Sequence, residues 1–386
     1  MKLLIPVVAL LLIVAGLVGP GRDATAYGVW WLTNSQAPEV ALMGPPGAVR
    51  GAIEVPVESR PSGRVEVVGA EIDGREVAPG AMLRVDTSGL ADGEHTLTVR
   101  AQDQSLRKNA ATAMLRITSD NTPPALDVQP SPTSIPQGHT VVIHIRPNEP
   151  AEVQASLGEQ PLRLFPAGTG FWAVVGVDAD EQAGQRELVV EGRDRVGNPG
   201  RAQGSVAVAP FAFTRDSLQV APAMLPLLAP NVRAAEDDRL KAVYQRENGP
   251  PLWKGAFTLP VSGPISTEFG EVRSYNGSPF GGHHGGTDFQ VGLNVPVLAP
   301  ARGRVVLREE VRLRGKVLVL DHGGGVYTTY AHLEDWTAGE NQEVEAGQPI
   351  AKVGSTGLST GPHLHWELWV GGKNVNPLEW TEREVP

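Results

Sequence analysis

Two eleven-residue segments of alternating polarity, set 91 positions apart, constrain the fold of this chain more than any other feature. Residues 93–103 and 184–194 each begin with glycine, place leucine and then valine on one side of a period-two pattern, and end with aspartate. Successive side chains of a β-strand point to opposite faces, so each segment is expected to be a half-buried strand. The spacing is about the length of one two-sheet β-sandwich. An internal repeat of this length predicts two β-sandwiches in tandem.

We assign the two predicted sandwiches to residues 38–121 and 122–210, with the boundary at the Asn-Thr-Pro-Pro sequence of residues 121–124. The chain has no cysteine, so the disulfide of antibody domains is absent and the segments resemble bacterial immunoglobulin-like modules. Their histidines, His95, His139 and His144, are isolated and are expected to be ordinary surface or half-buried strand residues. The absence of cysteine also restricts any metal site to nitrogen and oxygen ligands.

Composition agrees with a mostly β chain of two or three domains. Among 386 residues there are 45 glycines and 33 prolines, which favours frequent turns over long helices. The formal net charge of −10 argues against non-specific binding to nucleic acid as the main activity.

The N-terminus has the pattern of an export segment. Lys2 precedes an uncharged apolar run over residues 3–19, which predicts an apolar helix within residues 1–26. An Ala-Thr-Ala sequence at residues 24–26 favours cleavage of a signal peptide. Retention as a membrane anchor is favoured instead by the aromatic residues that follow, Tyr27, Trp30 and Trp31. Either alternative places the rest of the chain outside the cytoplasm.

Residues 211–255 are expected to be a linker with a short helix. Prolines at positions 222, 226 and 230 interrupt the chain, and residues 234–246 have helix-forming composition. Leu240, Val243 and Tyr244 are spaced for one apolar face. Such a helix could pack on the following domain, or it could cover an active-site groove as an inhibitory segment.

Residues 256–382 predict a third domain, built mainly of antiparallel strands. Short runs of β-forming residues alternate with glycine turns, at residues 303–307, 316–320, 325–330 and 363–370.

Six of the nine histidines of the chain lie in this third region, and five of them fall in three segments, at residues 283–289, 330–333 and 361–367. His363 and His365 are two residues apart in a predicted strand, so both imidazoles share a face. The glycines next to His284 allow the backbone to bring His284 and Asp288 to one ion. A catalytic zinc site needs three protein ligands and one open position, and imidazole and carboxylate groups are the suitable ligands here.

The ordered motifs of residues 257–380 resemble the lysostaphin/LytM-type metallopeptidases, also called the M23 family. The signature of that family pairs an H-x-G-x-D segment, here residues 284–288, with an H-x-H segment, here residues 363–365. Further matching segments are residues 266–270, 297–300, 330–333, 347–350 and 354–362.

This resemblance implies a role for each candidate residue. His284, Asp288 and His365 would bind one Zn²⁺ ion, and His332 and His363 would be a catalytic pair outside the metal ligands. The metal would activate a water molecule for attack on an amide carbonyl. One histidine of the pair would move protons and the other would stabilise the developing oxyanion, and the sequence leaves open which does which.

Several neighbouring residues have alternative interpretations. His283 could replace His284 as the ligand, but the motif spacing favours His284. His322 is expected to be structural or to orient a ligand. Glu367 could orient a histidine or form a surface ion pair, and Trp366 should point into the core. Tyr275 receives no role.

The resemblance implies an endopeptidase of the cell envelope that cuts peptide cross-links of bacterial peptidoglycan. The sandwiches would then act as spacers, or bind the wall or other envelope proteins, and the N-terminal helix allows membrane anchoring. The main alternative is a non-enzymatic regulator or scaffold of other wall hydrolases, since some relatives have lost their metal ligands. An unrelated metallohydrolase or metal-storage module is a third hypothesis, which the surrounding motifs disfavour.

Overall fold

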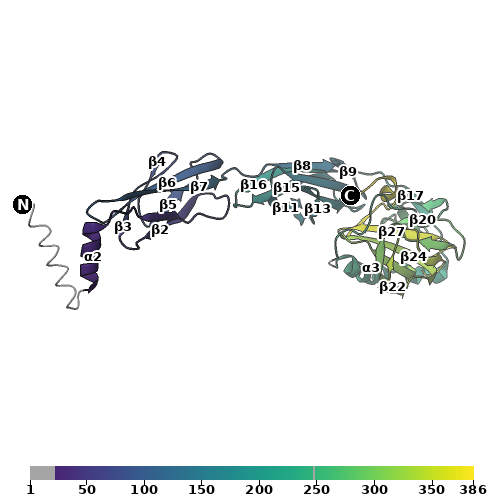
Figure 1. The fold of residues 1–386 in the computed structure, drawn as a ribbon. Coiled ribbons are helices and arrows are strands. Elements are labelled where there is room, and N and C mark those ends of the chain that lie inside the picture. Colours follow the sequence, from purple (N-terminus) through teal and green to yellow (C-terminus); the bar gives the residue numbers. More distant parts are fainter. Residues whose placement is uncertain (1–21, 247) are drawn as a thin grey trace, which may run out of the picture. The chain divides into compact units, whose positions relative to one another are not determined.

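The computed structural model describes residues 22–386 except residue 247, and the chain divides into two compact units (Figure 1). One unit spans Met1–Pro124 and Arg193–Pro199, and the other spans Ala125–Gly192 and Gly200–Pro386. The predicted apolar helix of residues 3–19 lies outside the described residues. Within residues 22–386, helix α2 (Arg22–Thr33) comes first, and no helix in this part of the chain is long and apolar enough to cross a membrane.

The first unit contains two antiparallel sheets packed around a common core. The three-stranded sheet has the order β1 (Glu39–Leu42), β2 (Ala52–Arg60), β5 (Met82–Asp86). The four-stranded sheet has the order β4 (Arg75–Val77), β3 (Val65–Ile72), β6 (Gly93–Asp103), β7 (Ala110–Ser119). Inward-facing aliphatic residues of both sheets, among them Val55, Leu83 and Leu97, form the buried core, which is the layered arrangement of a β-sandwich.

A second pair of packed sheets lies mainly in the second unit, and it includes one parallel pairing, that of β16 with β9. Its first sheet has the order β13 (Phe165–Ala167), β14 (Gly170–Gly176), β10 (Thr140–Pro147), β8 (Leu126–Ser131). Its second sheet has the order β12 (Gln160–Pro161), β11 (Ala151–Leu157), β15 (Gly184–Asp194), β16 (Pro199–Ala209), β9 (Ser134–Pro136). The immunoglobulin-like character and the domain borders remain predictions.

The internal repeat marks one strand in each sandwich, as predicted. Strands β6 and β15 have the bounds of the two repeated segments. The repeated leucine and valine positions, 97 and 99 in β6 and 188 and 190 in β15, are fully buried in their respective cores. The terminal aspartates are also buried, and each accepts hydrogen bonds from backbone amides of the turn that follows. The shared pattern therefore encodes both a buried strand face and the turn after it.

The C-terminal region forms one ten-stranded sheet beside a two-stranded one. The main path runs β18 (Ile265–Thr267), β20 (Thr287–Phe289), β27 (Leu364–Val370), β24 (Val326–Trp336), β23 (Gly315–Asp321), β22 (Gly303–Val311), β25 (Glu343–Val344). Off this path lie β21 (Pro296–Leu298), β26 (Pro349–Val353) and β28 (Lys373–Val375). The small sheet pairs β17 (Arg215–Leu218) with β19 (Val272–Tyr275) in parallel. The four predicted strands of this region correspond to β22, β23, β24 and β27, and their pairings are antiparallel, as expected.

Strand β27 is buried along its whole length because both of its faces are covered. Leu364 and Trp366 belong to the main core of the C-terminal sheet, so Trp366 is a core residue as predicted. On the opposite face, Trp369 packs in a separate cluster with residues of helix α3 (Pro230–Tyr244). The alternation predicted for this strand thus separates a core face from a face that carries polar side chains.

Helix α3 is part of the C-terminal unit. It follows a short 3₁₀ helix, η1 (Pro222–Leu228), and begins at Pro230, where proline is favoured in the first helical turn. Its buried residues include the predicted apolar set, Leu240, Val243 and Tyr244. The Tyr244 ring stacks on that of Trp369, with ring centroids 4.3 Å apart.

The second sandwich and the C-terminal sheet share an aromatic core. Trp172 of β14 meets Trp253 edge to face, and Trp253 also contacts Trp380 of the short helix α4 (Glu379–Glu382). The Glu379 carboxylate accepts hydrogen bonds from the amide and hydroxyl of Thr140 in β10. This packing joins sandwich and sheet within one unit.

Candidate metal centre

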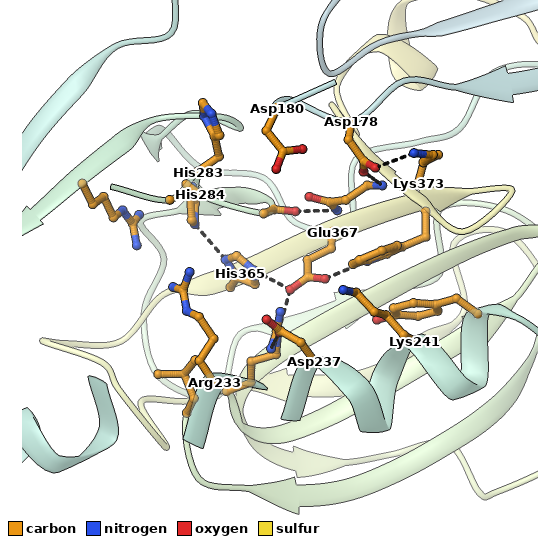
Figure 2. A pocket seen from close by; sticks show the side chains of 18 of the residues that line it. Asp178, Asp180, Arg233, Asp237, Lys241, His283, His284, His365, Glu367 and Lys373 are labelled. Atoms are coloured by element: carbon orange, nitrogen blue, oxygen red, sulfur yellow. Dashed lines mark hydrogen bonds and ion pairs between the residues drawn. The ribbon is translucent and has the colours of Figure 1, made fainter. Parts of the chain in front are cut away.

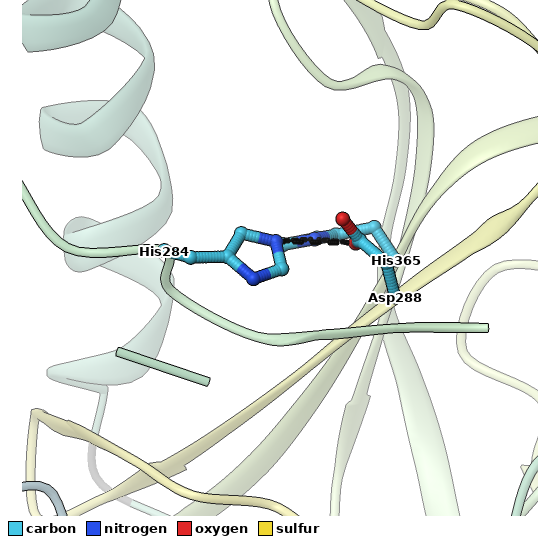
Figure 3. Close-up of side chains that lie close together, drawn as sticks. All are labelled: His284, Asp288 and His365. Atoms are coloured by element: carbon cyan, nitrogen blue, oxygen red, sulfur yellow. Dashed lines mark hydrogen bonds and ion pairs between the residues drawn. The ribbon is translucent and has the colours of Figure 1, made fainter. Parts of the chain in front are cut away.

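Three side chains predicted to bind metal converge at one point of the C-terminal sheet (Figure 3). Asp288 on β20 and His365 on β27 are directly opposite in the antiparallel register, which places their side chains side by side. Asp288 Oδ1 lies 2.7 Å from His365 Nδ1 and 3.1 Å from His284 Nε2, and the two ring nitrogens are 3.0 Å apart. All three residues are buried, and one ligand atom from each lies within 4.8 Å of the others.

The hydrogen bonds of the two imidazoles decide which nitrogen faces this point. His284 Nδ1 lies 2.9 Å from the carbonyl oxygen of Glu268, and His365 Nε2 lies 3.0 Å from Glu367 Oε1. Because these oxygens only accept, the bonded nitrogens carry the protons. His284 Nε2 and His365 Nδ1 are therefore the atoms directed at this point, and a metal ion would replace the proton that His365 Nδ1 shares with Asp288.

The carboxylate of Asp288 is also oriented by a hydrogen bond to one of its two oxygens. Its Oδ2 accepts a hydrogen bond of 3.1 Å from Arg273 Nη2, and Arg273 Nε donates to Glu271. This pairing leaves Oδ1 directed at the two histidines, so Asp288 can offer one ligand oxygen.

Gly286, between the first two predicted ligands, is required by close packing. A Cβ at this position would lie 2.4 Å from the backbone oxygen of Trp366 and 2.9 Å from His365 Cε1. Any larger residue would push β20 away from β27 and separate Asp288 from His365. The glycine of the H-x-G-x-D segment thus permits the strand pairing that forms the centre.

His332 and His363, the predicted catalytic pair, lie next to each other beside this centre. Their ring centroids are 4.6 Å apart, and His332 is 5.9 Å from the ring of His365. His332 Nδ1 donates to the carbonyl of Thr356 and His363 Nδ1 donates to that of Gly361, at 2.8 and 2.9 Å. Each ring therefore keeps Nε2 free, and Nε2 of His363 lies 4.0 Å from Asp288 Oδ1.

His332 has an irregular backbone conformation. It lies inside β24, at a φ of 57°, where the pairing with β23 and β26 shifts register. A left-handed backbone is unfavourable for a residue with a side chain. The irregularity turns the imidazole toward His363 and is of the kind that concentrates at functional sites.

Burial and charge give the histidines different protonation states. Burial lowers the pKa of His284 to about 4 and that of His332 to about 3. Burial alone would also lower the pKa of His365, but Asp288 and Glu367 raise it to about 9. Burial disfavours ionisation of Asp288, yet His284 and His365 outweigh it and hold the pKa of this carboxyl well below its usual range.

Glu367 orients His365, and the alternative of a surface ion pair is wrong. Its side chain is fully buried on the polar face of β27. Besides His365, its Oε1 accepts a hydrogen bond of 2.8 Å from Arg314 Nε, and its Oε2 accepts one of 2.8 Å from Trp369 Nε1. Arg314 and the histidine outweigh burial and keep the pKa of Glu367 low.

Arg314 connects this carboxylate to helix α3, a connection that sequence reasoning missed. Its Nη1 lies 3.2 Å from Glu236 Oε1 and 3.0 Å from Asp237 Oδ1. Glu236 is buried and also accepts hydrogen bonds from the backbone amides of Leu313 and Arg314. A signal existed, since Glu236 is four residues before Leu240 and thus on the apolar face of α3, where an unpaired carboxylate would be costly.

The remaining candidates lie outside the centre. His283 Nδ1 bonds to the carbonyl of Gly270, and its ring packs on Phe213. His322 is buried between the carbonyl of Arg302 and the hydroxyl of Thr328, and burial lowers its pKa to about 4. His283 and Tyr275 line the adjoining cavity.

A cavity of about 520 Å³ opens on the centre (Figure 2). His284, His332, His365 and Glu367 contribute to it from the C-terminal sheet and its loops. One further wall comes from helix α3 and another from Asp178 and Asp180 of the second sandwich. The buried histidine cluster is therefore accessible from a concave polar space in which a substrate could bind.

The part of the chain that contains this site also matches a known protein family. Residues 282–377 match peptidase family M23. This segment contains the three convergent residues and the neighbouring histidine pair.

Curated relatives align with the C-terminal region and share only part of their length with this chain. An uncharacterized metalloprotease of Haemophilus influenzae is 38% identical over 144 residues, covering 35% of this chain and 29% of the relative. The peptidoglycan DD-endopeptidase ShyA of Vibrio cholerae is 35% identical over 138 residues, covering 35% and 32%. The murein hydrolase activator NlpD of Salmonella dublin is 31% identical over 156 residues, covering 40% and 37%. The chain thus spans about a third of the length of these relatives.

Proposed function

We propose that this chain, whose residues 282–377 match peptidase family M23, is a zinc-dependent endopeptidase that hydrolyses peptide cross-links of bacterial peptidoglycan. The observation that carries this proposal is the convergence of His284 Nε2, Asp288 Oδ1 and His365 Nδ1, each with its other polar atom already bonded. The ShyA relative acts on peptidoglycan according to its name, which supports the substrate class.

The donor set fits one Zn²⁺ ion. Two imidazole nitrogens and one carboxylate oxygen are ligands that zinc accepts, and three protein ligands leave a position open for water or substrate. Zinc held in this way lowers the pKa of water and polarises a carbonyl group. The hydrogen bonds of Glu268, Glu367 and Arg273 pre-orient the ligands, which reduces the reorganisation needed to bind the ion.

His332 and His363 are placed for proton transfer and for hydrogen bonding to a carbonyl oxygen. Each imidazole has its Nδ1 proton committed to a backbone carbonyl, so its Nε2 is the reactive atom. The burial that lowers the pKa of His332 keeps this ring neutral at physiological pH, and in this proposal one imidazole of the pair accepts a proton at Nε2. The later return of that proton to the leaving amine completes the cycle.

Peptidoglycan lies outside the cytoplasmic membrane, so this function requires export. The apolar N-terminal run of residues 3–19 supports a location in the cell envelope. The sandwich modules would hold the catalytic region at a distance from the membrane, or bind the wall or envelope proteins.

Release of soluble peptides from purified peptidoglycan tests the function. The full chain loaded with zinc should bind about one ion and release fragments, and mass spectrometry of the fragments identifies the cleaved bond. Asp288→Asn should abolish release, whereas His144→Gln, a substitution in β10 outside the centre, should leave it unchanged. A zinc-loaded protein that releases nothing from several wall types would refute the enzymatic function.

The alternative is a non-enzymatic regulator of other wall hydrolases, as the name of the murein hydrolase activator NlpD suggests. This chain retains all five predicted site residues, and a regulator has no need of them. Two results together would favour this alternative. The wild type would show no hydrolysis of its own, and the Asp288→Asn variant would stimulate a second hydrolase as strongly as the wild type does.

A further inference from the structure

The wall of the cavity formed by helix α3 presents three charged residues at successive i, i+4 positions. Arg233, Asp237 and Lys241 therefore share one face of the helix. All three line the cavity, and Figure 2 shows the side chains of Arg233 and Lys241 directed from the helix into it.

Asp237, the carboxylate between the two cations on the helix, pairs with a residue outside the helix. In an isolated helix Asp237 would pair with Arg233 or Lys241. Here Asp237 Oδ1 is 3.0 Å from Arg314 Nη1 instead. Within residues 22–386 as described, neither cationic side chain forms a hydrogen bond or ion pair.

The other cations that line the cavity are neutralised. Arg273 pairs with Asp288, Arg314 pairs with Glu367, and Lys373 pairs with Asp178 at 3.1 Å. Of the carboxylates that line the cavity in the described part of the chain, only Asp180 has no ion pair. Arg233 and Lys241 still leave an excess of positive charge on the α3 wall, in a chain whose formal net charge is −10. Such a concentration of one sign attracts a ligand of the opposite sign.

The two cations lie at different distances from the loop that carries His284. Arg233 lies against Gly282, two positions before His284, since a Cβ on that glycine would be 3.3 Å from Arg233 Nη1. Lys241 is about 12 Å further along the helix axis. Arg233 is therefore the cation closer to the loop that carries the first predicted ligand.

We propose that Arg233 and Lys241 form a carboxylate-recognition subsite, so that the cavity selects peptides with a free carboxylate close to the bond that is cleaved. The proposal rests on the proposed function and specifies its substrate class. A planar guanidinium can bind a carboxylate through two parallel hydrogen bonds, which gives Arg233 the larger share of recognition. Lys241 acts as a second point charge toward the far end of the peptide.

Binding of cross-linked muropeptide dimers to the zinc-free full chain tests the subsite independently of catalysis. Dimers with free carboxyl groups should bind about tenfold more tightly than dimers whose carboxyl groups are converted to methylamides, the effect of one charge-assisted hydrogen bond. Arg233→Gln should lose this factor for the free dimers only, and Arg233→Lys should restore part of it. Because the variant and the chemical change remove the same contact, their effects should not add.

Arg239→Gln is the matched control. Arg239 lies on the same helix, pairs with Glu309 at 3.0 Å and is not part of the cavity. Equal affinity of the wild type for the two forms of dimer, or an equal loss for both forms in Arg233→Gln, would overturn the subsite. Cleavage of the same dimers by the zinc-loaded chain is measured separately, so failure of the catalytic function is recognised as such.

Discussion

At the scale of single residues, the site depends on which ring nitrogen each histidine has committed to a hydrogen bond. The motif identified the five residues, and the structure brings them together. The acceptors that orient them come mainly from backbone carbonyls, for example those of Glu268, Thr356 and Gly361. Because a backbone carbonyl is present at every position, no side-chain pattern in the sequence could have identified these acceptors.

The two histidines of the His-x-His segment should respond differently to substitution. His365→Ala removes a ligand atom and should lower zinc affinity by more than about 100-fold, beyond the loss expected for a residue that only supports a ligand. His363→Ala should retain zinc and lose hydrolysis. Zinc content after dialysis and release of wall fragments measure the two effects. Equal loss of metal in both variants would contradict the division of roles.

The raised pKa of His365 makes zinc affinity depend on pH. In the metal-free protein this imidazole keeps a second proton up to about pH 9, and zinc must displace that proton from Nδ1. Affinity should therefore rise with pH by about tenfold per unit between pH 6 and 8 and level off near pH 9. His284, with a pKa of about 4, is already neutral in this range and adds nothing. Chelator competition at several pH values measures the slope, and a flat profile would exclude a protonated His365.

At the scale of elements, helix α3 supports the metal centre through both oxygens of Glu367. On one side Glu236 holds Arg314, which donates to Oε1, and on the other Tyr244 stacks on Trp369, which donates to Oε2. These contacts favour the alternative in which the helix packs on the domain. The helix also lines one side of the cavity, and it forms no hydrogen bond to the predicted ligands. An inhibitory role for α3 is not needed to explain its packing.

Weakening one of these contacts should lower the affinity of the site for zinc. Glu236→Gln removes a charge from the support of Arg314 and should lower zinc affinity by about tenfold, at the lower end of the effects measured for partners of ligands. Cobalt substitution supplies a spectroscopic readout, because a reoriented His365 changes the visible absorption of the bound ion. Asp238→Asn, an exposed neighbour on the same helix, is the control. An unchanged spectrum and affinity in Glu236→Gln would show that α3 contributes packing only.

The sequence predicted the strands, but it did not predict the ion pairs that support the site. Alternation in residues 93–103 and 184–194 reports burial of one face, a local property, and both strands have the predicted bounds. The pairing of Arg314 with Glu236 joins a turn to a helix 78 positions earlier. Many charged residues are available for such pairs, and only the tertiary fold determines which of them meet.

At the scale of the whole molecule, the second sandwich and the C-terminal sheet should unfold together. They share the aromatic core of Trp172, Trp253 and Trp380, and truncation of a buried tryptophan costs about 3–5 kcal/mol. Trp172→Ala should therefore lower the free energy of unfolding by about this amount, and loss of zinc should follow the same denaturation curve as loss of strand structure. Retention of the wild-type curve for zinc release in this variant would show that the catalytic region is stable on its own.

The shared aromatic core also affects how the C-terminal region could be exchanged between proteins by recombination. A segment cut at the borders of the family match, residues 282–377, would be transferred without α3, Trp253 or Trp380. Glu367, the carboxylate partner of His365, would keep Arg314 and Trp369 but lose Glu236 and Tyr244, the α3 residues that hold them. An apolar surface would also be newly exposed to water. A transferable piece that keeps these contacts runs from the second sandwich to the C-terminus. Inheritance of the proposed activity would therefore require a longer stretch of chain than its motifs occupy.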